Sequence, residues 1–174
     1  MQNIKGIKKN YNLFLLRILL LCFFILNCSS DYFQELSGSY FYLCEGENNK
    51  SIISHLPNRK SIFPKIIEYE YNSDFIIAIQ QPDYQEYIHM VAFDLRSDTI
   101  KYPLNSAGDI IKSEFVADSL LKFNEYYVKI FANKINFWII AHKQKQVYGP
   151  FKREEYLLKR KEVGIPNSLR LKKE

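Results

Sequence analysis

Three histidines, His55, His89 and His142, are the side chains of this 174-residue chain best suited to acid–base or metal chemistry. A zinc site would require them to converge with carboxylates. They are far apart in the sequence and fall in different expected elements, His89 within a strand and His142 at the cap of a hairpin. The spacing therefore predicts no metal site, and we expect neither a metal nor a cofactor.

Other motifs that carry chemistry are missing from the sequence. The glycines at positions 38, 46, 108, 149 and 164 are isolated, so they form no phosphate-binding loop. The segment Leu36–Tyr40 lacks the G-x-S-x-G spacing of a nucleophile elbow. Asp94, Asp98 and Asp109 lack the spacing of a calcium loop. We expect a protein that is not an enzyme, although carboxylates distant in sequence could still form a catalytic pair.

Residues 1–27 have the pattern of a secretory signal peptide. Lys5, Lys8 and Lys9 form a basic start without acids, and Arg17 extends it. The nine apolar residues Ile18–Leu26 follow. This run is far shorter than the roughly 20 residues that span a bilayer. It fits the apolar region of a signal peptide, which has about 7 to 15 residues.

The end of the apolar run has the sequence Ile25-Leu26-Asn27-Cys28. It resembles the lipobox of bacterial lipoproteins, with Ile25 at the aliphatic position and Cys28 at the residue that is alkylated by diacylglycerol. The resemblance implies cleavage before Cys28 and a lipid anchor with acyl chains such as palmitate. The alternatives are an uncleaved membrane anchor and cleavage at an ordinary signal site. Ser29 and Ser30 lack the Asp that retains some lipoproteins in the inner membrane, which favours the outer membrane of the cell envelope.

Processing at Cys28 would remove most of the net charge. The full chain has 24 basic and 19 acidic residues and a formal charge of +5; residues 1–27 contain four of the bases and no acid, which leaves +1. We therefore expect no nucleic-acid partner, because phosphate binding needs a basic folded surface. Residues 152–174 keep eight bases against four acids. We favour a solvated helix face and frayed tail there over a patch for anionic lipid or an acidic partner.

Cys44 would be the last free thiol of the processed chain, since Cys22 lies in the signal and Cys28 would be acylated. A single thiol forms no internal disulfide. Cys44 ends the apolar segment Tyr40–Cys44 and has no basic or histidine neighbour in the local sequence that would activate it. We expect a buried, inert thiol.

Strand patterns dominate the chain after the signal. Aromatic and β-branched residues between turn residues predict strands at 40–44, 52–53, 66–71, 75–79, 87–95, 99–102, 126–132, 137–141 and 147–148. The continuous apolar run 75–79 predicts a strand that is covered on both faces. Helices are predicted at 109–124, with Asp109 as N-cap, and at 153–162, where Gly164 and Pro166 follow the end.

These elements predict a mainly β, α+β fold. We expect a single antiparallel β-sheet-rich domain with one or two short helices, including a C-terminal helix. The expected organisation is a signal peptide at 1–27, an acylated N-terminus and flexible lead at 28–37, the β-rich domain at 38–166 and a basic tail at 167–174. Val91–Leu104 and Trp138–Phe151 share a strand–turn–strand pattern, which is weak evidence for a repeat.

Several segments of the chain are shared with a known group of proteins. The segments are Leu36–Tyr40, Glu45-Gly46, Phe75–Gln80, Trp138–Ile140, Val147–Phe151, Glu155-Tyr156, Arg160, Val163–Pro166 and Leu169. They resemble small bacterial lipoproteins that are grouped only as a domain of unknown function. The resemblance implies a lipid-anchored extracytoplasmic domain and carries over no catalytic residue.

The expected function is that of a lipid-anchored cell-envelope protein acting as a non-enzymatic binding or interaction module. Its expected partners are the membrane, through Cys28, and another envelope protein. The alternatives are an immunity-type lipoprotein that blocks a toxin and a small envelope hydrolase. A contiguous exposed aromatic patch with no buried polar cluster would favour the interaction module. A pocket that joins His89 or His142 to carboxylates would favour the hydrolase.

Overall fold

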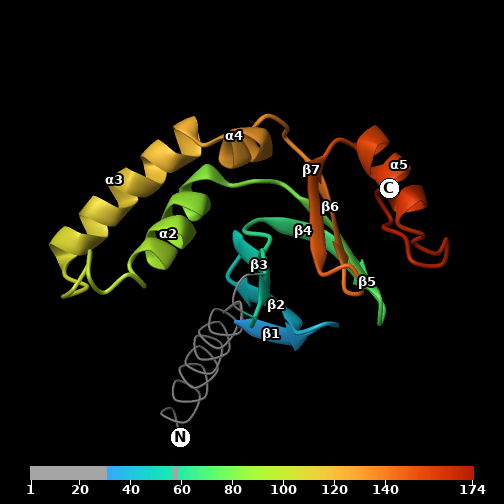
Figure 1. Cartoon of the computed structure of the whole chain (residues 1–174), viewed down its shortest axis with the longest axis horizontal. Helices are drawn as coiled ribbons and strands as arrows, with labels where there is room; N and C mark the ends of the chain where they lie inside the picture. The colour runs from blue at the N-terminus through green and yellow to red at the C-terminus, as the bar shows by residue number, and fades with distance from the viewer. Residues whose placement is uncertain (1–30, 57–58) are drawn as a thin grey trace, which may run out of the picture. The chain divides into compact units, whose positions relative to one another are not determined.

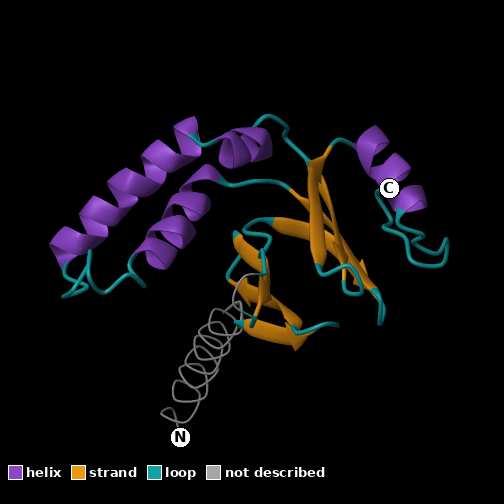
Figure 2. Cartoon of the chain, viewed as in Figure 1, coloured by secondary structure: helices purple, strands orange, loops and turns teal. Residues whose placement is uncertain are grey.

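The computed structural model describes residues 31–56 and 59–174, so Cys28 and the predicted signal peptide lie outside the described residues. The described part is an α+β structure with two antiparallel sheets and four helices (Figure 1, Figure 2). The three-stranded sheet has the order β1 (Tyr32–Glu35), β2 (Tyr40–Glu45), β3 (Asn49–Ser54). The four-stranded sheet has the order β4 (Ile66–Tyr71), β5 (Phe75–Gln80), β6 (Asn136–Ala141), β7 (Gln146–Phe151). The helices are α2 (Tyr84–Leu95), α3 (Ala107–Phe123), α4 (Glu125–Phe131) and α5 (Arg153–Glu162).

The central strands β5 and β6 are buried along their whole length. Alternate side chains of a strand point to opposite faces. Ile76 and Ala78 belong to the core that includes residues of the three-stranded sheet and of α2–α4. Ile77 and Ile79 belong to a second core with α5 and the segment after it. The prediction that 75–79 is covered on both faces is therefore confirmed, and Figure 1 shows α5 across the sheet from α2 and α3.

A buried polar network crosses the first core. The Gln80 Oε1 atom accepts hydrogen bonds from the Trp138 indole N–H at 2.9 Å and from the Asn136 amide at 3.2 Å. The Gln80 amide donates to the Phe63 carbonyl oxygen at 2.8 Å and to the Tyr87 hydroxyl. Each of these polar groups has a partner, so burial leaves none of them unsatisfied. The network ties β5 and β6 to α2.

Two segments that the sequence predicts as strands are helices. Residues 87–95 lie in α2, where the Asp83 carboxylate caps the helix by accepting from the backbone N–H of Gln85 at 3.0 Å. Residues 126–132 fall mostly in α4, capped by Asn124. In α2 the buried Tyr87 and Val91 are four residues apart, which is a helical spacing. The aromatic and β-branched residues of the segment favoured a strand prediction instead. Tertiary packing overrode a weak strand propensity in both segments.

Residues 99–102 form a turn and not the predicted return strand. The Asp98 carboxylate accepts from the backbone N–H of Ile100 at 3.1 Å and of Lys101 at 3.2 Å, which closes the turn. The proposed repeat of Val91–Leu104 and Trp138–Phe151 is therefore wrong, because the first segment is helix and turn while the second is a hairpin. The structure also corrects the expectation of a sheet-rich domain with one or two short helices. Its described residues form two antiparallel sheets and four helices.

The other predicted elements are confirmed with adjusted ends. The hairpin of β4 and β5 and the strand β6 are present, and α5 spans residues 153–162 as predicted. The helix predicted at 109–124 is α3, but its N-cap is Ser106 and Asp109 is the third residue of a capping box. The lead expected at 28–37 includes β1. Leu169 and Leu171 are buried against α5, so residues 167–174 pack onto the domain.

Candidate functional site

The structure separates the three histidines. His55 packs its ring on Phe41, with the ring centroids 4.0 Å apart. His89 lies on α2 and His142 follows β6. Across residues 31–56 and 59–174, no three His, Cys, Asp or Glu side chains gather closely enough to hold a metal ion. None of the described helices is long and apolar enough to cross a membrane.

His142 pairs with a serine that sequence spacing did not single out. Its Nε2 atom lies 2.8 Å from the Ser37 hydroxyl, which comes from the turn between β1 and β2. The imidazole ring packs so closely on Gly38 that a Cβ there would overlap it, and Gly38 also has φ +64°. Burial is the main cause that lowers the pKa of the His142 imidazole, and the nearby Arg59 guanidinium lowers it further. The Asp74 carboxylate opposes the shift. The ring is therefore neutral at neutral pH, and it links the two sheets.

His89 has a carboxylate partner, but the pair is on the surface. The Nδ1 atom of His89 lies 3.3 Å from Glu114 Oε1, between α2 and α3. The two side chains are 60% and 37% exposed. Neither residue lines the cavities next to α5 and β4. This geometry is that of a surface ion pair that forms only when the imidazole is protonated.

The two helices α2 and α3 pack side by side (Figure 1), and they and their connection carry large exposed apolar side chains. We call this surface the hairpin face. It consists of Phe93, Ile100, Leu104, Ile111, Phe115 and Phe123. Ile100 is 91% exposed and Phe115 is 76% exposed. These large apolar side chains, exposed along one pair of helices and their connection, are the candidate interaction surface of the domain.

The local sequence explains why these side chains are outside. In α3 the buried positions are Ser113, Ala117 and Leu121, which follow one another at intervals of four residues. Ile111 and Phe115 are also four residues apart, but they lie on another face of the same helix. The helix therefore buries the face with Ser113, Ala117 and Leu121 and leaves Ile111 and Phe115 exposed. The apolar residues Ile111 and Phe115, on the face opposite the buried one, are the sequence signal for this exposure.

A second surface feature is a cavity of about 500 Å³ between α5 and residues 165–174, which we call the α5 cavity. Its wall includes the basic residues Arg153, Lys161, Arg170 and Lys172 and the apolar residues Leu157 and Ile165. The sequence shows an excess of bases over residues 152–174, for which we expect a solvated helix face and a frayed tail. Packing of this segment against α5 instead places five of these eight bases, Arg153, Arg160, Lys161, Arg170 and Lys172, around one cavity.

Part of the chain matches a known family. Residues 117–174 match DUF3997, a protein of unknown function. The DUF3997 match covers the C-terminal end of α3 from Ala117, then α4, β6, β7, α5 and the segment that closes the α5 cavity. No curated protein and no solved structure matches the chain. The family match therefore agrees with the resemblance of the C-terminal segments and adds no activity to it.

Proposed function

We propose that this protein is a lipid-anchored, non-enzymatic interaction module of the cell envelope, and that the hairpin face binds another envelope protein. The observation that carries the proposal is the exposure of large apolar side chains along α2, α3 and their connection, above all Ile100 and Phe115. Their burial against a partner would remove apolar area from water, which is the main favourable term in protein association.

The charges around the hairpin face favour a protein over a bilayer as its partner. Residues 93–115 contain three bases, Arg96, Lys101 and Lys112, against four acids, Asp94, Asp98, Asp109 and Glu114. A surface that binds anionic lipid carries an excess of Lys and Arg near its apolar side chains. A mixed polar rim around apolar anchors is instead the composition of a protein interface.

The lipid anchor places this face where envelope proteins are concentrated. The proposed anchor is Cys28, and Tyr32 already begins β1. Only three residues therefore lie between the acylated cysteine and the first described strand. Each buried acyl CH₂ group contributes about 0.8 kcal/mol, so several acyl chains would hold the domain at the membrane stably.

Site-specific photo-crosslinking tests the proposal. A photo-reactive p-benzoylphenylalanine is placed at position 115, at position 100, or at the control position 134, in the full chain expressed in a bacterial envelope. We expect a discrete protein adduct from positions 100 and 115 that the control position does not form, and we expect Phe115→Asp to abolish the adduct formed at position 100. Identical products from all three positions, or adducts with lipid alone, would contradict the proposal.

A second candidate function is a small envelope hydrolase, which the Ser37–His142 pair favours. A neutral imidazole 2.8 Å from a serine hydroxyl can act as a general base for attack on an acyl carbon. The His142 Nδ1 atom is buried and has no hydrogen-bond acceptor within the described residues, whereas a carboxylate normally orients such a base there. The interaction module is therefore our first proposal. Covalent labelling of Ser37 by a fluorophosphonate, lost in Ser37→Ala, would support the hydrolase, and its absence would reject it.

A further inference from the structure

The α5 cavity has the size of a small-molecule site. Its volume of about 500 Å³ falls within the range of known ligand pockets, which is roughly 300 to 1,000 Å³. Arg153 and Lys161 stand on α5, two helical turns apart, whereas Arg170 and Lys172 come from the segment that folds back along the helix. The four cations therefore reach the cavity from two elements.

One residue of the cavity lining, Arg160, has its charge balanced by a carboxylate of the returning segment. Arg160 is buried, and its Nη1 atom lies 2.7 Å from Glu174 Oε1. The same guanidinium donates to the carbonyl oxygens of Pro166, at 3.0 Å, and of Leu169. These bonds fix the returning segment to α5. The cavity is therefore pre-formed, which reduces the cost of ordering it when a ligand binds.

The cations on the wall are not compensated in this way. Arg153, Lys161, Arg170 and Lys172 are exposed, and within the described residues none of them forms an ion pair. Two acids lie nearby. Glu174 is neutralised by Arg160, and Glu68 accepts a hydrogen bond from the backbone N–H of Lys172. The cavity keeps an excess of positive charge, which raises the local concentration of anions.

We propose that the α5 cavity binds a ligand that carries two or more phosphate charges, either as a soluble molecule or as a lipid headgroup. Arginine presents a planar fork of N–H donors that matches phosphate oxygens, and two of the four cations are arginines. The volume exceeds what one orthophosphate fills, and the apolar Leu157 and Ile165 can contact the rest of the ligand. This site is separate from the hairpin face, so its test stands apart from that of the proposed partner.

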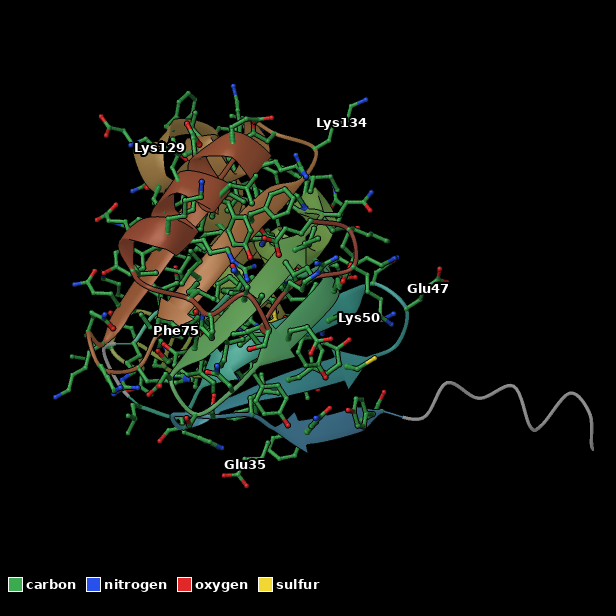
Figure 3. The ribbon with its side chains drawn as sticks, turned by 90° about the vertical axis from the view of Figure 1, so that its right-hand side faces the viewer. Glu35, Glu47, Lys50, Phe75, Lys129 and Lys134 are labelled. Carbon is green, nitrogen blue, oxygen red and sulfur yellow. The ribbon has the colours of Figure 1, made fainter. Side chains whose placement is uncertain are left out.

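The test compares two variants of the full chain in non-ionic detergent. The cavity variant is Arg153→Gln with Arg170→Gln, which takes one cation from each wall. The control variant is Lys129→Gln with Lys134→Gln, which removes the same charge elsewhere on the surface, where Figure 3 shows Lys134 pointing away from the body. All four side chains are exposed, and equal melting temperatures would show that both variants are folded. Pyrophosphate is the soluble probe, titrated by calorimetry at low salt.

After removal of the detergent, the second arm measures flotation with vesicles of phosphatidylcholine, with or without cardiolipin, whose headgroup carries two phosphates. Wild type and both variants share residues 1–30, so the contribution of that segment is the same in each. We expect the cavity variant to bind at least about tenfold more weakly than wild type, since two charged hydrogen-bond donors are lost, and the control to stay within about twofold. If the cavity variant loses binding to pyrophosphate, the ligand is a soluble molecule. If it loses binding to the anionic vesicles, the ligand is a lipid headgroup. If the cavity and control variants behave alike in both arms, or wild type binds neither probe, the proposal is overturned.

Discussion

Arg160 and Glu174 form a buried ion pair that fastens the end of the described chain to α5. The Arg160 Nη1 atom lies 2.7 Å from Glu174 Oε1, and the two side chains are only 8% and 15% exposed. The same carboxylate accepts from the Leu171 backbone N–H at 3.1 Å. One contact therefore holds Leu169 and Leu171 in the second core and shapes the wall of the α5 cavity.

Removal of this pair should cost more stability than removal of a surface pair on the same helix. We expect Glu174→Ala to lower the free energy of unfolding by about 3 kcal/mol, because it leaves a buried guanidinium without its counter-charge. The control is Glu162→Ala, which breaks the exposed pair with Lys159 and should cost less than about 1 kcal/mol. Urea titration measures both values. Equal losses would show that Glu174 does not hold the segment.

The stability of the domain should fall in mild acid because of His142. Its folded-state pKa is lowered from 6.5 by burial and by Arg59, so the unfolded chain takes up the proton first. The contribution of the neutral, buried His142 to the free energy of unfolding is fully present above pH 6.5. It is lost as the pH falls below this value, until the His142 imidazole of the folded state is protonated as well. One proton limits the slope to about 1.4 kcal/mol per pH unit.

Urea unfolding of wild type and His142→Gln at pH 7.5 and pH 5.5 measures this effect. We expect the difference in stability between the two proteins to change over this interval, with wild type losing more on acidification. Ser37→Ala removes the hydrogen bond but keeps the imidazole buried, so it should retain the wild-type pH dependence at lower stability. Parallel pH profiles for wild type and His142→Gln would refute the assignment.

The hairpin face should contribute little to folding. Phe115 is 76% exposed, and Phe115→Ser should change the free energy of unfolding by less than about 1 kcal/mol. Leu121 of the same helix is 2% exposed, and Leu121→Ala should cost about 2 to 5 kcal/mol through lost burial and a cavity. Thermal unfolding distinguishes the two. A large loss for Phe115→Ser would mean that this side chain packs within the domain and is not available to a partner.

Gln80 should be essential to the first core, although it is polar. Gln80→Leu would leave the Trp138 indole N–H and the Asn136 amide with a missing acceptor, and we expect a loss of at least about 2 kcal/mol. Trp138 is the only tryptophan of the chain, so its fluorescence reports the change directly. Gln81→Leu at the exposed neighbouring position is the control and should leave both stability and emission unchanged. A stable Gln80→Leu variant with wild-type emission would contradict this role.

The intact mass of the membrane-fraction protein tests the lipid anchor. We expect wild type from a bacterial host to begin at Cys28 and to carry the added mass of a diacylglyceryl group. Cys28→Ala should lack this mass, because the thiol that is alkylated is absent. Cys44→Ala is the control and should be modified like wild type. An unmodified wild-type chain that retains residues 1–27 would show that the segment is an uncleaved anchor.

Local patterns in the sequence were sufficient for some elements of the fold. The hairpin around Asn72, the buried run from Phe75 to Ile79 and the helix ended by Gly164 follow from turn residues, continuous apolar character and capping, all of which act within a few residues. The same approach failed for α2 and α4. Their aromatic and β-branched residues favour strands locally, and only packing against the first core makes them helical.

The candidate sites divide in the same way. The sequence alone determined the resemblance to a lipobox at Cys28, the excess of bases over residues 152–174 and the separation of the histidines along the chain, because each of these is a property of residue order. Only the tertiary structure brought Ser37 to His142, left Phe115 exposed and closed the returning segment over α5. Those relationships join residues far apart in the chain or depend on which face of a helix is covered. Long-range packing decides both, and local spacing does not record it.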